Sequence, residues 1–123
     1  MSEYKPMFGK GVKRKKRKAK NNPRPTDQDC CAITGKPYAE LHEVFYGVNR
    51  QKSIQYGMQI RLSPEYHRIG ANAVHNNPAF DLQLKQEFQK NFEAEHGHDK
   101  FMAVFRKNYI GITVEEYKRQ GVA

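Results

Sequence analysis

Two short stretches of alternating polar and hydrophobic residues predict a pair of antiparallel strands. In residues 38–45, YAELHEVF, side chains of Leu41, Glu43 and Phe45 share one face, and those of His42 and Val44 share the other. In residues 56–63, YGMQIRLS, hydrophobic residues again occupy alternate positions. The segment between them, VNRQKSIQ, is too long for a tight turn and too polar for a core. We interpret it as a long connection, and such connections often carry function.

The C-terminal half changes to a helical period. Apolar residues recur every four positions and predict a long amphipathic helix over residues 78–95 that packs on the core. The residues of this stripe are Phe80, Leu84, Phe88 and Phe92. After a break at HGHD, the run KFMAVFRKNYI offers a second apolar face, and a last short helix is expected to begin near Thr113. His96 and His98, in the break, are interpreted as helix-end residues.

The net charge of the chain is concentrated at its N-terminus. Residues 1–25 hold ten of the 22 basic residues but one of the 13 acidic residues, so this segment alone accounts for the net charge of +9. A run such as KRKKRKAK repels itself and has nothing apolar to bury, so we expect residues 1–28 to be a disordered tail and residues 29–123 to be one domain. DNA is the expected partner, and a solubilising or targeting role is the alternative. The cations expected to contact phosphates are Lys13, Arg14, Lys15, Lys16, Arg17 and Lys18.

The sequence argues against secretion and membrane insertion. The N-terminus lacks the apolar core of a secretory signal, and no apolar run approaches the ~20 residues of a membrane span. The only cysteines, Cys30 and Cys31, are adjacent and cannot build a disulfide framework. We therefore expect a protein of the reducing cytoplasm.

Three histidines lie on or beside the predicted strands. His42 is within the first strand, and His67 and His75 flank a segment with glycine and asparagine after the second. Neutral imidazoles are common metal ligands, so all three are candidates for binding one divalent ion, Mg²⁺, Mn²⁺, Ni²⁺ or Zn²⁺, with Mg²⁺ the least favoured. Each histidine alone is also compatible with an ordinary strand or loop position.

The succession HEVFYG, SIQYG, LSPEYHR and GANAVHNN resembles phage-type members of the HNH (His-Me finger, ββα-metal) endonuclease superfamily, over roughly residues 29–110. It is similar to the recombination enhancement (Ref) nuclease group. The resemblance implies a small α+β fold, in which a two-stranded finger is followed by C-terminal helices. It also implies metal-dependent hydrolysis of double- or single-stranded DNA in phage recombination or DNA processing, inside a bacterial host, with a recombination or replication protein as a possible partner.

The resemblance also assigns roles to residues. In that family the first strand carries a metal ligand followed by a general-base histidine, and a loop asparagine orients the base. His42 and Glu43 occupy the pair here, and Asn49 lies in the connection. The pair therefore implies His42 as ligand and Glu43 as base, with His42 as base in the other register; a carboxylate at the base position departs from the family pattern. Nearby cations expected to contact the scissile phosphate are Arg50, Lys52 and Arg68.

Many members of the family also hold a structural zinc ion with two C-x-x-C pairs. This chain has Cys31 and Thr34 at the first pair and Ser63 and Tyr66 at the second. We therefore expect hydrogen bonds and apolar packing to replace the zinc. Two other functions stay open: a non-catalytic DNA- or RNA-binding protein that keeps the finger as a scaffold, and an RNA- or ribosome-associated protein whose seven tyrosines stack on bases.

Overall fold

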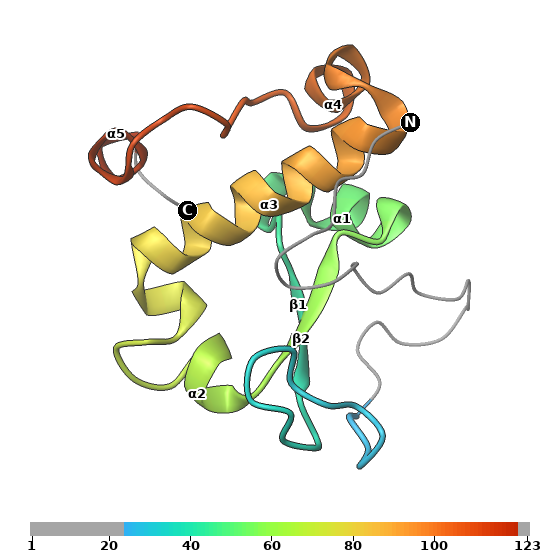
Figure 1. Ribbon diagram of the computed structural model, residues 1–123, viewed down its shortest axis with the longest axis vertical. Helices are drawn as coiled ribbons and strands as arrows, with labels where there is room; N and C mark the ends of the chain where they lie inside the picture. The colour runs from blue at the N-terminus through green and yellow to red at the C-terminus, as the bar shows by residue number, and fades with distance from the viewer. Residues whose placement is uncertain (1–23, 121–123) are drawn as a thin grey trace.

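A two-stranded antiparallel hairpin lies against a long helix in the computed structural model, which describes residues 24–120 (Figure 1). The α+β class predicted from the sequence is confirmed. Most of the predicted basic tail, including Lys13 to Lys18, lies outside the described residues. The elements in chain order are β1 (Glu40–Glu43), η1 (Gly47–Asn49), α1 (Arg50–Tyr56), β2 (Gln59–Leu62), α2 (Pro64–His67), η2 (Val74–Asn76), α3 (Pro78–His96), α4 (His98–Phe105) and α5 (Val114–Arg119).

The hairpin pairs both predicted strands, although each is shorter than its alternating segment. Its register places His42 opposite Ile60 and Glu43 opposite Gln59. The connection, which we expected to be a loop, contains the helix α1 instead. No side chain caps the start of α1, and its C-terminal residue is followed by Gly57 at φ 72°, a left-handed conformation that turns the chain into β2.

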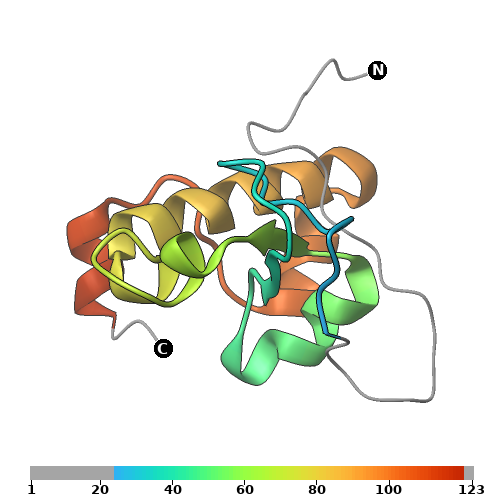
Figure 2. The same ribbon diagram turned by 90° about the horizontal axis from the view of Figure 1, so that it is seen from below.

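The helix predicted over residues 78–95 is α3, and it crosses the hairpin in both views (Figures 1 and 2). The side chain of Asn77 caps α3 by accepting a hydrogen bond from Phe80 N. Helix α4 packs beside the C-terminal half of α3 and α5 beside its N-terminal half. Thr113 and Glu116 form a capping box at the start of α5, as expected for a helix beginning there.

Aromatic residues of α3 and α4 form the core beneath the end of β1. The ring of Phe45 lies 4.6 Å from that of Phe105 and 5.5 Å from that of Phe101, between ring centroids. Phe88 and Phe92, from the predicted stripe, are 1% exposed. His42 itself is 2% exposed, so the packing of its neighbours restricts where its ring can lie.

The segment before β1 is attached to the far end of the hairpin. Tyr38 N donates to Thr26 O at 3.1 Å, and Ala39 N donates to Asp29 O at 2.7 Å. The folded body therefore begins at least as early as Thr26, a few residues before the predicted boundary at residue 29. No helix of residues 24–120 is both long and apolar enough to cross a membrane.

Candidate metal centre

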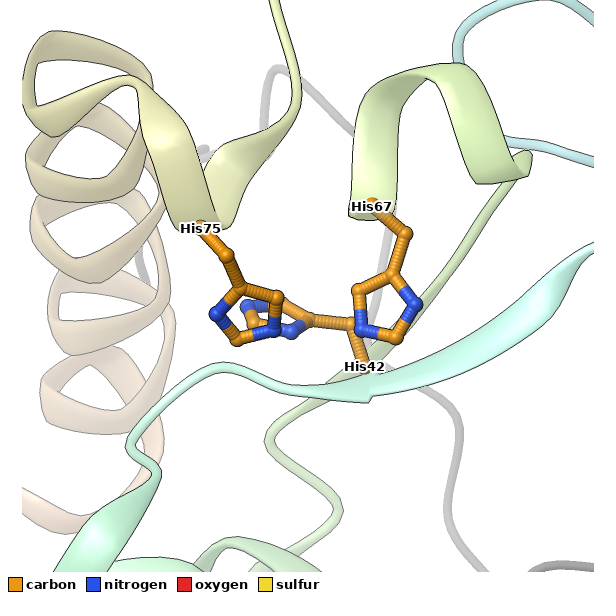
Figure 3. Close-up of side chains that lie close together, drawn as sticks. All are labelled: His42, His67 and His75. Carbon is orange, nitrogen blue, oxygen red and sulfur yellow. The ribbon is translucent and has the colours of Figure 1, made fainter. Parts of the chain in front are cut away.

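The three candidate histidines come from three separate elements and point toward one another (Figure 3). His42 lies in β1, His67 is the last residue of α2, and His75 lies in η2. Their ring centroids are 5.0 to 5.1 Å apart, and one ligand nitrogen from each lies within 4.8 Å of the others. Two ligands of one ion span at most about 4 Å, so an ion would need to draw these nitrogens together by about 1 Å or less. These residues are called the His cluster below.

Local structure on both sides of the loop between α2 and η2 brings the His cluster together. Pro64 starts α2 directly after β2, where its fixed φ suits the first helical position. The side chain of Asn76 then closes the loop by donating to Gly70 O at 2.9 Å. The loop therefore returns His75 to a position beside His42 and His67.

His42 is held as a neutral imidazole. It is 2% exposed, and its Nε2 is buried without a hydrogen-bond partner among the described residues. Burial lowers the pKa of His42 well below its usual value, and the neighbouring His67 and His75 lower it further. Burial and His67 also lower the pKa of the more exposed His75. Neutral imidazole is the form that binds metal ions, so the site is prepared for ligation.

Glu40 orients the third imidazole. Its Oε1 lies 2.7 Å from Nδ1 of His67, and because a carboxylate only accepts, Nδ1 must donate. This bond leaves Nε2 of His67 as the free ligand atom. Arg68 holds the same carboxylate, with Nη2 2.8 Å from Oε2, and the hydrogen bond from Arg68 is the main cause that lowers the pKa of Glu40. Sequence reasoning missed Glu40, although it precedes His42 by two residues and therefore shares its face of β1.

The predicted base, Glu43, is directed away from the His cluster. Consecutive residues of a strand point to opposite faces, so Glu43 and His42 cannot share one. Its Oε2 accepts from Gln59 Nε2 at 3.2 Å, and its Oε1 lies 3.5 Å from Arg50 Nε. This arrangement argues against the assignment of Glu43 as the base.

The predicted orienting residue, Asn49, also has a different partner. Its Nδ2 donates to Phe105 O at 3.1 Å, and Lys52 Nζ donates to Val104 O at 2.9 Å. Both side chains thus satisfy carbonyl groups at the C-terminal end of α4, where the helix leaves them unpaired. Arg50 pairs with Glu43, and Arg68 pairs with Glu40. The three predicted phosphate-binding cations of the body, Arg50, Lys52 and Arg68, therefore all have a partner within the protein.

The two degenerate C-x-x-C segments face each other at the start of α2. Cys31 is 4% exposed, and its Sγ accepts from Ile33 N and Thr34 N, each at 3.4 Å. Burial acts to raise the pKa of the Cys31 thiol, but hydrogen bonds from Thr34, Ser63 and Ile33 outweigh it and bring the pKa to about 7. Hydrogen bonds therefore hold this turn together, as expected. Residues 31–35 and 63–66 are called the Cys31 site below.

His96 and His98 lie outside the His cluster. They are the last residue of α3 and the first residue of α4, as predicted, and Nδ1 of His98 lies 2.6 Å from Glu93 Oε2. Comparison with known proteins assigns no relative to the chain: no family model, no curated protein and no solved structure matches it.

Proposed function

We propose that this protein is a metal-dependent endonuclease of the HNH type that hydrolyses DNA phosphodiester bonds, and that β1, β2 and the following histidine-bearing segments form its ββα-metal finger. The observation that carries the proposal is the convergence of three imidazoles from separate elements, one of them buried with an unpartnered nitrogen. The order of these histidines along the chain is the order that the family resemblance implies. Phage recombination or DNA processing in the bacterial cytoplasm is the setting that we propose.

The donor set fits a divalent ion. Three neutral imidazoles lean toward Zn²⁺, Ni²⁺ or Mn²⁺ and leave coordination positions open, as in catalytic three-histidine sites. An ion bound there would stabilise negative charge on a phosphate oxygen and lower the pKa of a water molecule. His42, His67 and His75 would hold it, and Glu40 and Arg68 would fix the ring of His67.

We assign His42 to the ligand role and not to the base role. A general base needs a pKa near the working pH, and the pKa of His42 lies well below its usual value because the ring is buried. Protonation would place a positive charge on the buried His42 ring, and His67, His75 and Lys85 all oppose that charge. The basic residues of the N-terminus would supply the sequence-independent DNA affinity, since phosphate contacts position a protein without specifying a sequence.

A non-catalytic nucleic-acid-binding protein is the second candidate. The observation that favours it is the commitment of Glu43 and Asn49 to structural partners, which leaves neither beside the His cluster. In that case the metal ion would stabilise the finger, and the protein would bind DNA without cleaving it.

The deciding experiment is a nicking assay on supercoiled plasmid with Mn²⁺, Zn²⁺, Ni²⁺ or Mg²⁺, together with calorimetric titration of the same ions. We expect His67→Ala and His75→Ala each to lower metal affinity at least 100-fold and to abolish nicking while the helical content is kept. His98→Ala is the matched control, because it removes a histidine outside the His cluster and should change neither quantity.

Two results would contradict parts of the proposal. Metal binding by the wild-type protein without nicking under any of the four ions would favour the non-catalytic candidate. A Glu43→Gln variant with unchanged metal affinity and nicking lowered by the ~10²–10⁴-fold typical of a lost base would restore Glu43 to the catalytic role.

A further inference from the structure

A buried polar network lies between α3, α5 and the end of β1. Its centre is the ion pair of Asp81 and Lys85, 2% and 3% exposed, with Lys85 Nζ 3.2 Å from Asp81 Oδ2. The same oxygen accepts from the hydroxyl groups of Tyr46 at 2.7 Å and Tyr117 at 2.6 Å. Burial is the main cause that raises the pKa of both tyrosines, and Asp81 raises it further, so both hydroxyls keep their protons and donate. Three donors therefore converge on one oxygen of one carboxylate.

The second carboxylate oxygen of Asp81 is not bound by this network. Oδ1 is buried and has no hydrogen-bond partner among the described residues. An unpartnered buried carboxylate oxygen destabilises a protein, and native structures rarely keep one without a role. The crowding on Oδ2 fixes the orientation of the carboxylate, so Oδ1 is held in place for a donor that the network itself does not supply.

The His cluster is the neighbour of this network. The ring of Tyr46, whose hydroxyl binds Asp81, lies 5.2 Å from the ring of His75 and 5.9 Å from that of His42, between centroids. His75 lies in η2, shortly before Asn77 and the start of α3, and Asp81 lies in the first turn of α3. Tyr46 therefore contacts the Asp81 carboxylate through its hydroxyl group and the ring of His75 through its own ring.

His75 lacks the support that His67 has. Nδ1 of His67 is bound to Glu40, whereas neither ring nitrogen of His75 makes a hydrogen bond to another described residue. Histidines that bind metal ions almost always donate their second ring N–H to a carboxylate, a carbonyl group or water, which fixes the ring. Among the described residues, Asp81 Oδ1 is thus an acceptor without a donor, and His75 is an imidazole without an acceptor. Both residues contact Tyr46.

We propose that Asp81 is the positioning residue of His75: when one ring nitrogen of His75 binds the metal ion, the other donates its N–H to Asp81 Oδ1. This inference rests on the proposed metal site. It gives the His cluster two supporting carboxylates, Glu40 for His67 and Asp81 for His75.

The test is the affinity of the full-length protein for Zn²⁺, measured in a chelator-buffered titration. Asp81→Asn alone leaves Lys85 buried without its charge partner, so the test variant is the double substitution Asp81→Asn with Lys85→Met, which keeps size and removes both charges. Loss of such a supporting partner costs metal affinity about 10- to 100-fold, and we expect a decrease in this range. Tyr117→Phe is the matched control, since it removes one of the three donors to Oδ2, leaves Tyr46 and Lys85 to hold the carboxylate and does not change Oδ1; we expect its zinc affinity to stay within about threefold.

A second readout separates positioning from a general loss of structure. In ¹⁵N NMR spectra of the zinc-loaded protein, we expect a slowly exchanging ring N–H of His75 in wild type and in Tyr117→Phe but not in the double variant. The inference is overturned if the folded double variant binds Zn²⁺ as wild type does, if the His75 ring signal is unchanged, or if Tyr117→Phe weakens binding equally. It also falls if the wild-type protein does not bind Zn²⁺. Zinc binding with the predicted Asp81 effect but no nicking would contradict the nuclease proposal alone.

Discussion

The four-residue helix α2 has the Cys31 site at its start and the His cluster at its end, and the two differ in the ligand atoms that they offer a metal ion. At its start, Ser63 faces Cys31, whose Sγ is surrounded by backbone N–H groups. At its end, His67 faces His42 and His75. The Cys31 site has turns closed by backbone hydrogen bonds and a single sulfur, whereas the His cluster has three imidazoles, one of them bound to the Glu40 carboxylate.

The turns of the Cys31 site are closed by backbone hydrogen bonds and not by the side chains at the C-x-x-C positions. In the Cys31 site, Tyr66 N and His67 N both donate to Ser63 O at 2.9 Å, and Gly35 N donates to Cys31 O at 2.9 Å. In the His cluster the rings themselves have few hydrogen bonds, so an ion would provide the interactions that the protein does not.

The largest effect is expected from restoring the missing thiolates. A variant with Thr34→Cys, Ser63→Cys and Tyr66→Cys places four sulfurs at the two C-x-x-C segments, and we expect it to bind a second equivalent of Zn²⁺ with a dissociation constant of about 10 nM or lower. Inductively coupled plasma mass spectrometry counts the ions. Absorption of the Co²⁺-loaded protein shows whether thiolates are the ligands.

A companion variant that also carries Cys30→Ser excludes a contribution from the exposed cysteine. Tyr66→Cys alone measures the stability lost with the ring that packs near Phe80 at 6.3 Å. If the triple variant folds and still binds one equivalent, the two turns do not face each other in the way described.

Sequence patterns predicted the elements with regular apolar spacing and the three histidines, but few of their partners. The stripe of α3 and the alternation of the strands are local signals, so both elements were found. Helix α1 has a single buried residue, Ser53, and no side-chain cap, so it carries no apolar period that could reveal it. The partners of Asn49 and Lys52 lie more than 50 residues away, at the end of α4, so nothing in the sequence around His42 indicated them.

The supporting residues were missed for different physical reasons. Glu40 was accessible to strand alternation, since it lies two residues before His42 on the same face. Asp81 was not, because an acid in the first turn of a helix is ordinarily explained by the helix dipole. Only the tertiary contacts of Tyr46 and Tyr117 show that this acid is buried beside the His cluster.

A smaller effect is expected from pH. The His cluster and the Cys31 site change the stability of the protein in different pH ranges. Burial lowers the pKa of His42 in the folded state, and His67, His75 and Lys85 lower it further, so the unfolded chain binds more protons below pH 6.5. The free energy of unfolding of the metal-free protein should therefore fall as pH decreases from 7 to 5, with a slope of up to about 1.4 kcal/mol per pH unit for each such group. Chemical denaturation with EDTA present measures it.

The Cys31 site acts at higher pH. The folded thiol has a pKa of about 7 against a usual 9.0, so the folded state binds fewer protons between these values and stability should rise from pH 7 to 9. His42→Gln should flatten the acidic slope and keep the alkaline one, and Cys31→Ala should do the reverse. Equal loss of both slopes in either variant would mean that other groups dominate the titration.

The smallest effect is expected at an exposed ion pair of the Cys31 site. Lys36 Nζ lies 2.8 Å from Glu65 Oε2, with both side chains more than half exposed. Solvent and salt screen such a pair, so Glu65→Gln should leave the denaturation midpoint and the zinc affinity unchanged within error at physiological ionic strength. Glu40→Gln is the matched change at the His cluster, where the carboxylate is less exposed and fixes His67, and it should lower zinc affinity about 10- to 100-fold. A zinc affinity that falls equally in both variants would show that the carboxylate acts through overall charge and not through the ring of His67.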